Sequence, residues 1–410
     1  MEDQRVERPD RGSAREIFLV FLRLGLTSFG GPIAHLGYFR TELVENRKWL
    51  SDAAYADLVA LCQFLPGPAS SQTGFALGLI RGGWAGALAA WIGFTTPSAI
   101  AMILFAYGAA GLDGGIGAGV IAGLKGLAVA IVAHAVLGMG RNLCQGATRL
   151  SIMLAAMVLL GLWASPIAQL LAIALGGALG LALISDGEES AGEAPPFRPA
   201  GALRQSTGIA LIAAAGAILV ATPLLVGLGI GGHAMALFDA FYRAGALVFG
   251  GGHVVLPLLE GSVVGAGWVS AQAFLAGYGA VQAVPGPIFT FAAYLGAANS
   301  LPPSGVWGAM IALVGIFLPG CLLVAGTLPL WDRLRRWERA RAILAGVNAA
   351  VVGVLAQALY DPVFLSGILS PLDFAVASGA FLALTAYRAP VWWVVVGMIV
   401  IGGVRGAIGL

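Results

Sequence analysis

Two hexapeptides, Gln63-Phe-Leu-Pro-Gly-Pro68 and Gln282-Ala-Val-Pro-Gly-Pro287, stand in the middle of long apolar stretches and decide the fold. Proline lacks a backbone N–H and clashes with the preceding helical turn, so each Pro-Gly-Pro ends one helix and starts another. Inside a bilayer the backbone groups freed by such a break are costly unless protein or a wet cavity covers them. The sequence therefore predicts two broken helices, each held inside a membrane protein.

The composition supports this class of protein. Of the 410 residues, 59% are hydrophobic and only 10% are charged, and the mean hydropathy is +0.90. Soluble domains carry about 25% charged residues, whereas a bilayer-spanning helix needs about 20 apolar residues. We therefore expect an all-α polytopic membrane protein. Its apolar segments are residues 16–38, 54–80, 83–110, 115–139, 150–164, 167–185, 207–230, 234–258, 271–298, 304–330, 342–360, 363–387 and 390–408.

The two halves of the chain repeat one another. Several anchors recur in the same order, which is too much agreement for chance similarity between apolar helices. The anchors pair Phe21–Gly31 with Phe241–Gly251, Trp49-Leu-Ser51 with Trp268-Val-Ser270, the two hexapeptides with each other, Trp84 with Trp307, and Gly123-Leu-Lys125 with Gly346-Val-Asn348. We expect Ser51 and Ser270 to cap helices, and Trp49 and Trp268 to lie at the membrane interface.

The long polar stretch at residues 186–206 is rich in Pro, Gly and Glu, which is typical of a linker. We predict a cytoplasmic arm at 1–15, a first repeat at 16–185, this cytoplasmic linker, a connecting transmembrane helix at 207–230, and a second repeat at 231–410. One extra crossing between the halves would insert the second repeat upside down, as in many secondary transporters.

Charge placement indicates which segments cross. Cytoplasmic loops are enriched in Lys and Arg, yet Arg40, Arg47 and Lys48 fall outside if every segment crosses. If the four Gly- or Pro-interrupted segments instead dip in and return, only Arg405 falls outside. We predict this re-entrant arrangement in the cell inner membrane, with a cytoplasmic N-terminus. The four segments are 16–38, 54–80, 234–258 and 271–298.

The restarted helices predict an anion site, because the first N–H groups and the positive dipole end of a helix favour negative charge. A packing kink without a ligand is the alternative. The candidate substrate-binding residues of the breaks are Gly30, Gly31, Gly67, Ser70 and Ser71 in the first repeat and Gly250, Gly251, Gly286 and Thr290 in the second.

Arg23 and Arg243 occupy equivalent positions, six residues before a Phe-Gly-Gly. An arginine in an apolar segment usually faces the protein interior or a cavity, and its planar fork suits an oxyanion. We therefore include both arginines in the candidate substrate site. Snorkelling of the side chain to the interface is the alternative.

Four other polar residues are candidates for coupling or for balancing charge. Lys125 stands mid-segment, either as a cavity charge or as a counter-ion partner. His35 and His253 follow the glycine breaks and could relay protons, although satisfied polar contacts are the commoner role. Glu260 ends the conspicuous run that begins at Phe249.

Other classes of function find no support in the sequence. It contains no cofactor motif, no metal-ligand cluster and no nucleophile–base pair, and the charges inside the apolar segments are taken to be basic only, so we expect no enzyme. Cys62, Cys144 and Cys321 are expected to be buried thiols. The basic run Arg333–Arg341 predicts contact with lipid headgroups rather than nucleic acid.

With these motifs the chain resembles the chromate ion transporter family in its long, two-domain form. The resemblance implies chromate efflux giving chromate resistance, with sulfate as the structural mimic. A passive channel or an exchanger for another small inorganic anion is the alternative, and a homodimer is left open. Gly261-Ser262 departs from the family, where further charges often follow the glutamate. The resemblance rests on Phe29-Gly-Gly-Pro, Arg47-Lys-Trp-Leu-Ser51, both hexapeptides, Phe249-Gly-Gly-Gly-His-Val-Val-Leu-Pro-Leu-Leu-Glu260 and Ala292-Ala-Tyr-Leu-Gly296.

Overall fold

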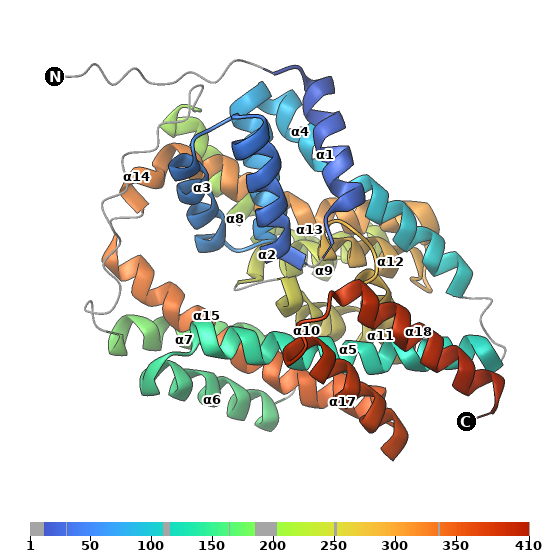
Figure 1. Ribbon diagram of the computed structural model, residues 1–410. Coiled ribbons are helices and arrows are strands. Elements are labelled where there is room, and N and C mark those ends of the chain that lie inside the picture. The colour runs from blue at the N-terminus through green and yellow to red at the C-terminus, as the bar shows by residue number, and fades with distance from the viewer. Residues whose placement is uncertain are drawn as a thin grey trace.

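The computed structural model describes residues 12–29, 31–109, 115–163, 165–184, 203–249, 252–334 and 337–409. Within these ranges every regular element is helical (Figure 1), which confirms the predicted all-α class. Most of the N-terminal arm, most of the linker, and Gly30, Gly250 and Gly251 lie outside the described residues. Among the described residues, five helices are by length and composition apolar enough to cross a membrane, namely Ala69–Gly108, Gly115–Leu143, Gln205–Gly227, Gly305–Leu330 and Arg339–Gly367.

The described residues of the first half form seven α-helices and one π-helical turn, and the connecting helix follows. These elements are α1 (Ala14–Thr27), α2 (Gly31–Phe39), η1 (Arg40–Asn46), α3 (Asp52–Phe64), α4 (Ala69–Ala109), α5 (Gly115–Leu143), α6 (Gly146–Leu162), α7 (Pro166–Leu183) and α8 (Gln205–Gly227).

The second half repeats this order with shorter pieces. Its elements are α9 (Gly232–Leu247), η2 (Gly252–Val254), α10 (Val255–Leu259), η3 (Glu260–Val264), α11 (Ala271–Val281), η4 (Ile288–Thr290), α12 (Phe291–Ala297), α13 (Gly305–Thr327), η5 (Leu328–Leu330), α14 (Trp331–Leu334), α15 (Glu338–Ala358), η6 (Leu359–Phe364), α16 (Leu365–Gly367), α17 (Pro371–Thr385) and α18 (Val391–Ala407).

Equivalent elements share local details. A π-helical turn, η1 or η3, stands at the same place in each half. The next helix then starts at a serine cap, where Ser51 accepts from the Ala54 N–H and Ser270 from the Ala273 N–H. These bonds satisfy N–H groups that would otherwise have no intrahelical partner. Both predicted caps are confirmed.

The chain folds back sharply within α4, where Gly82 and Gly83 leave helical geometry and Gly83 has a φ of 63°. The fold-back brings Gly78 against the backbone of Gly86. The second half has a loop between α12 and α13 at this place, and Gly296 lies against Gly308 there.

The predicted apolar segment at 363–387 starts too early. Residues 359–367 instead form η6 and α16, and α17 begins only at Pro371. The reason is local, because Pro362 lacks an N–H and the Ser370 side chain caps the new helix by accepting from the Asp373 N–H.

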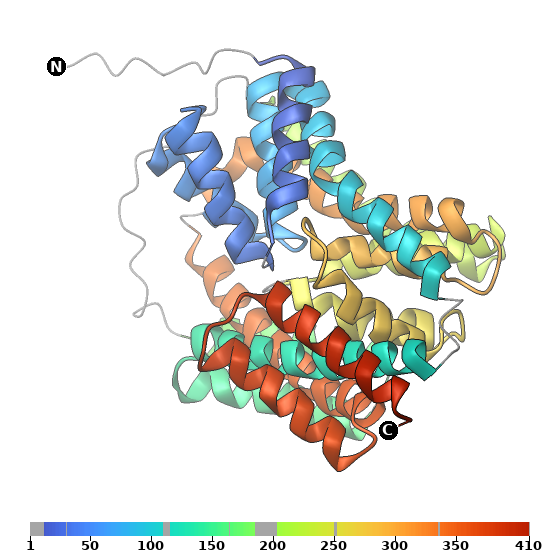
Figure 2. The same cartoon turned by 45° about the vertical axis from the view of Figure 1, so that its right-hand side comes forward.

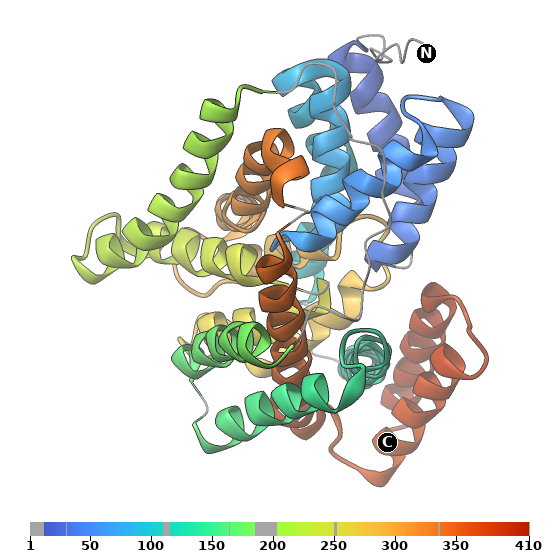
Figure 3. The same ribbon diagram turned by 90° about the vertical axis from the view of Figure 1, so that its left-hand side faces the viewer.

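The two halves exchange their last helices. The pair α17 and α18 packs on α5, and the pair α6 and α7 packs on α15 (Figures 2 and 3). Glycines line both interfaces, with Gly119 against Gly402 and Gly346 against Gly176, so the helix backbones approach closely. Figure 1 shows that equivalent helices of the two halves run in opposite directions: α5 runs opposite to α15, and α7 runs opposite to α18.

In the first half, the helix pairs α1–α2 and α3–α4 form two hairpins, and their ends lie together. The Gly12 N–H donates to the Arg81 carbonyl at 3.1 Å, and the Arg81 guanidinium lies 5.3 Å from the centre of the Trp49 ring. The start of α1, the loop before α3 and the fold of α4 therefore meet at one end. Trp49 is buried there beneath the Arg81 guanidinium, and its position at the membrane interface stays a prediction.

The second half forms the same kind of end. His233, at the start of α9, packs edge-on against Trp268 at 4.7 Å between ring centres. The Asn299 amide donates to His233 Nε2 at 2.7 Å. Trp268 is only half-buried. In each half, then, two helical hairpins turn back toward the end at which they start.

Candidate anion site where the two breaks cross

Each Pro-Gly-Pro loop reaches across to the other half of the molecule, and the place where the two loops do so is called the crossing. The Gly67 N–H donates to the carbonyl of Val248, at the end of α9, at 2.7 Å. The Gly286 N–H donates to the carbonyl of Ser28, at the end of α1, at 2.9 Å. Each break is therefore fixed by the other half, and the two bonds join equivalent positions.

Both loop glycines are needed for this crossing. Gly67 has a φ of 123° and Gly286 a φ of 100°, a region that other residues rarely adopt. A Cβ at Gly67 would lie 2.9 Å from the Gln72 amide nitrogen, and one at Gly286 would lie 2.8 Å from Ser98 Oγ. The structure therefore supports a close-approach role for these two predicted residues.

Residues that follow helix-internal prolines complete the crossing. Ser98 follows Pro97 in α4, and Gly320 follows Pro319 in α13. Ser98 faces the Gly286 loop, and Gly320 faces the Gly67 loop. Sequence reasoning missed this pair, although a proline after each matched tryptophan was the available signal.

The first break restarts as the first limb of α4, from Ala69 to the fold at Gly82, with polar residues in its first turn. Helix α4 begins at Ala69, and by helical geometry its first N–H groups have no intrahelical partner. Ser70 and Ser71, both predicted, are buried here. Gln72, which the prediction omitted, donates through its side-chain amide to the carbonyls of Pro66 at 2.9 Å and Gly320 at 3.3 Å.

Buried polar atoms without a hydrogen-bond partner gather on the segments that meet here. Buried polar groups are normally paired, so each such atom calls for an explanation. Hydroxyl groups, a ring nitrogen that carries a proton and helical N–H groups are all donors that an oxyanion could accept from. Among the described residues, the unpaired donors near the crossing are Ser28 Oγ, His35 Nε2, Ser71 Oγ, Thr95 Oγ1 and Gln282 Nε2, and Gln72 Oε1 is an unpaired acceptor.

His35 lies between the two breaks. Its side chain is 1% exposed, and its Nδ1 is 3.4 Å from Ser70 Oγ in the first turn of α4. The ring packs edge-on against Phe94 at 5.4 Å between centres, and the backbone of Ser28 adjoins it. This histidine, expected only as a coupling candidate, therefore belongs to the crossing itself.

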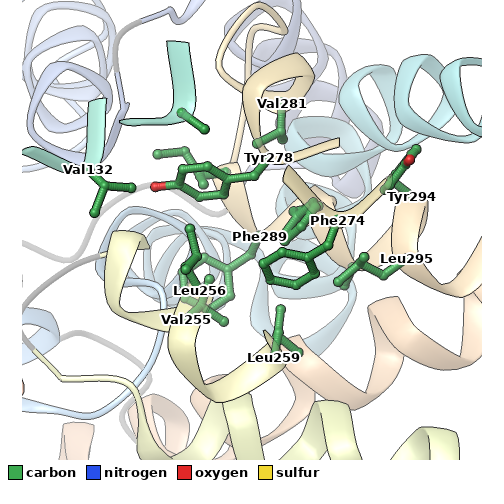
Figure 4. Packing of buried hydrophobic residues seen from close by; sticks show 14 of the residues in the cluster. Val132, Val255, Leu256, Leu259, Phe274, Tyr278, Val281, Phe289, Tyr294 and Leu295 are labelled. Atoms are coloured by element: carbon green, nitrogen blue, oxygen red, sulfur yellow. The ribbon is translucent and has the colours of Figure 1, made fainter. Parts of the chain in front are cut away.

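The second break restarts in apolar surroundings. Ile288, Phe289 and Thr290 form the short helix η4, and the Thr290 hydroxyl donates to the Pro287 carbonyl of its own turn at 2.8 Å. Figure 4 shows Phe289 among aliphatic and aromatic side chains of the core. The predicted Gly31 has a φ of 82°, and a Cβ there would lie 3.5 Å from Ile288 Cδ1.

The two arginines differ in surroundings. Arg23 is exposed on α1, with the Glu42 carboxylate in electrostatic range. Arg243 forms an ion pair of 2.6 Å with Asp239, which is 2% exposed and also accepts from the Thr222 hydroxyl at 2.7 Å. The expectation that the embedded charges are basic only is therefore wrong. The signal was the Asp–Arg spacing of four residues, which places both side chains on one helix face.

The remaining candidates lie outside the Pro-Gly-Pro loops. Lys125 is half-buried on α5, with the Asp373 carboxylate in electrostatic range. His253 Nδ1 shares a 2.6 Å hydrogen bond with the Tyr278 hydroxyl. Glu260 is half-buried at the start of η3.

Neither the thiols nor the metal-ligand residue types gather into a site within the part of the chain that the structure describes. All three cysteines are free thiols, with Cys62 and Cys144 buried and Cys321 half-buried. The same described residues contain no group of three His, Cys, Asp or Glu side chains that could hold a metal ion.

These features define a multi-pass helical membrane protein of the transporter class, built from two matched halves whose broken helices cross. A family model described as chromate transporter matches residues 15–181 and again residues 235–403. The chain belongs to the chromate transporter family, and the two separate matches agree with the predicted repeat.

Named relatives cover most of the chain. It is 29% identical over 376 residues to a probable chromate transport protein of Synechococcus elongatus, which covers 87% of this chain and 89% of that protein. It is 29% identical to the chromate transport protein of Pseudomonas aeruginosa (86% and 82%) and 27% identical to that of Cupriavidus metallidurans (84% and 81%). No solved structure matches the chain.

Proposed function

We propose that this protein is a secondary transporter that moves chromate across the cytoplasmic membrane, and that sulfate competes as its structural mimic. We further propose that transport runs outward and gives chromate resistance. Membership of the chromate transporter family supports chromate as the cargo, as does similarity to proteins named chromate transport proteins.

The observation that carries the proposal is the polar crossing of the two breaks. A tetrahedral oxyanion presents several acceptor oxygens, and the start of α4 offers N–H groups beside unpaired hydroxyls such as Ser71 Oγ. Helix N-termini at broken helices hold anionic groups in other secondary transporters. Chromate and sulfate have the same shape and charge, so both fit this donor set.

We propose that the two halves are inverted in the membrane and that their first hairpins are re-entrant. The end where Gly12, Trp49 and Arg81 meet carries basic residues, whereas the end around Trp268 has none nearby in the sequence. Positive charge favours the cytoplasm, so the first end would be cytoplasmic and the second external. The opposed directions of equivalent helices support the same arrangement.

The test is counterflow in proteoliposomes that contain the purified full-length protein. Vesicles loaded with unlabelled chromate should accumulate labelled chromate transiently above its equilibrium level, and unlabelled sulfate should also drive this exchange. Empty vesicles provide the control. Flux that never exceeds the imposed gradient would instead indicate a passive channel, and exchange of another inorganic anion without chromate would contradict the cargo.

A further inference from the structure

We propose that the two breaks play different roles: the oxyanion is bound at the first break alone, where His35 Nε2 donates to it, and the second break is an apolar wall. This inference rests on the proposed transport of an oxyanion and names the residue that would contact it. The matched backbones of the two loops would by themselves predict two equal half-sites.

The surroundings of His35 support its role as a donor. A neutral imidazole has one N–H donor and one acceptor nitrogen, and the partner of one nitrogen fixes the role of the other. Ser70 Oγ faces Nδ1 at 3.4 Å. If the hydroxyl donates to Nδ1, the proton lies on Nε2, which is buried without a partner among the described residues. The backbone of Ser28 adjoins the ring, but its carbonyl accepts from the Gly286 N–H, so this buried N–H group has no hydrogen bond of standard geometry.

The position of the ring makes an anion the fitting partner. His35 faces the first turn of α4, a helix long enough for its dipole to favour negative charge at this end. Ser71, in the same turn, is only 4% exposed, and its Oγ is also unpaired. Both groups can donate to one oxyanion, whereas an apolar ligand would leave them unsatisfied.

The second break lacks each of these features. The position equivalent to Ser70 is Phe289, which packs 6.0 Å from Phe317 between ring centres and belongs to the apolar core (Figure 4). The position equivalent to Ser71 is Thr290, whose hydroxyl is already bonded within its own turn. His253 is likewise engaged, by Tyr278. An anion placed at the second break would meet the apolar side chains of the restarted turn, and its free donors would be the Gln282 amide before the break and hydroxyls such as Ser28 Oγ that the first half brings there.

Three substitutions of His35 test the role of Nε2, with chromate affinity measured by calorimetry on the purified full-length protein in detergent. The Gln amide nitrogen reaches the place of Nε2, whereas the Asn amide reaches only that of Nδ1. We expect His35→Leu and His35→Asn to weaken the chromate Kd by about tenfold or more, the effect of one hydrogen bond to a charged group. His35→Gln should recover most of the affinity.

A merely structural role would give another pattern. If His35 only holds Ser70, then Asn should rescue better than Gln, and this result would overturn the inference. His233→Gln is the matched control, because this histidine is bonded to Asn299 at the far end of the second hairpins; it should leave the Kd unchanged. Melting temperatures in the same detergent identify a variant that misfolds, and the Gln and Asn variants then decide the question.

The same binding assay also tests the difference between the two breaks. Ser71→Ala should weaken chromate binding, and Thr290→Ala should do so far less. Equal losses would show a shared symmetric site and overturn the inference. Failure of the wild-type protein to bind or exchange chromate would contradict the proposed function itself, whereas normal wild-type transport with normal His35→Leu binding would contradict this inference alone.

Discussion

The two Pro-Gly-Pro breaks share one backbone design and differ in chemistry. In both, the glycine N–H donates to the last carbonyl of the opposite half's first helix, from Gly67 to Val248 and from Gly286 to Ser28. After the first break come buried hydroxyls; after the second come Ile288 and Phe289. The comparison shows that one crossed backbone frame holds two different linings, polar after the first break and apolar after the second.

The largest expected difference between the halves is the side of the membrane on which their hairpin ends lie. In a background without Cys62, Cys144 and Cys321, a cysteine at Glu45 should react only with a reagent applied from the cytoplasm. One at Ala266 should react only from outside, because both positions are exposed and the proposed halves are inverted. The measurement is labelling of intact cells and of inverted vesicles with a membrane-impermeant maleimide.

Ala266 is a better site than Ser262, which is half-buried and bonded to the Leu258 carbonyl. If Glu45 is instead labelled from the periplasm, the first segments cross fully and the re-entrant arrangement is wrong. If both positions react from the same side, the halves are parallel rather than inverted.

The next largest effect should come from replacing the glycine of either Pro-Gly-Pro loop with a larger residue. Gly67→Val and Gly286→Val should both abolish chromate exchange, because each adds a Cβ within 3 Å of a neighbouring side-chain atom. Each also forces a β-branched residue into positive φ, which costs about 1–3 kcal/mol in backbone strain alone. Exchange in proteoliposomes and the yield of folded protein are the measurements.

The control for these variants is Gly138→Val, because a Cβ at Gly138 has no neighbour within 4 Å. It should retain exchange. If Gly286→Val keeps full activity while Gly67→Val is inactive, transport does not need the second loop in its present conformation. The prediction that both loops are required would then be wrong.

The two arginines offer a third comparison. Arg243→Ala leaves the buried Asp239 carboxylate without its counter-charge, although the Thr222 hydroxyl still donates to it. Because the Arg243 side chain is 39% exposed, the loss should be about 1–3 kcal/mol. Arg23→Ala removes an exposed side chain, so its effect on folding should be small. Melting temperatures of the two variants in one detergent test this difference.

The double variant Arg243→Ala with Asp239→Asn separates stability from transport. If it regains the lost melting temperature and also exchanges chromate, Arg243 serves only to balance Asp239. If the fold recovers and exchange does not, the arginine takes part in transport as the sequence suggested. Transport that fails in Arg23→Ala at normal stability would equally support the predicted role of Arg23.

Sequence patterns predicted the frame of this molecule well because the frame depends on backbone chemistry. Proline and glycine mark breaks wherever they stand in an apolar segment, so the places of both Pro-Gly-Pro loops and the capping roles of Ser51 and Ser270 could be read directly. The repeat was visible because both halves keep the same anchors.

The contents of the site were less predictable, because they depend on which segments meet. Nothing local marks Ser28, Thr95 or Ser98 as neighbours of the opposite break; they arrive there only when the halves interlock. Asp239 was overlooked for the opposite reason. Its partner, Arg243, stands one helical turn away and was judged alone rather than as half of a pair.

The smallest expected effect concerns the amides that flank the breaks. Gln72 donates to Pro66 and Gly320, so it ties the first loop to α13, whereas the half-buried Gln282 has an unpaired amide nitrogen. Gln72→Leu should cost about 1–3 kcal/mol, since it removes two hydrogen bonds and leaves their carbonyls unpaired. Gln282→Leu should leave stability unchanged or raise it slightly, because it removes an unsatisfied donor from a partly apolar setting. Thermal unfolding of both variants with and without saturating chromate is the measurement. A loss for Gln282→Leu that appears only with chromate would mean that the second break does touch the anion, and the contrast between the breaks would have to be withdrawn.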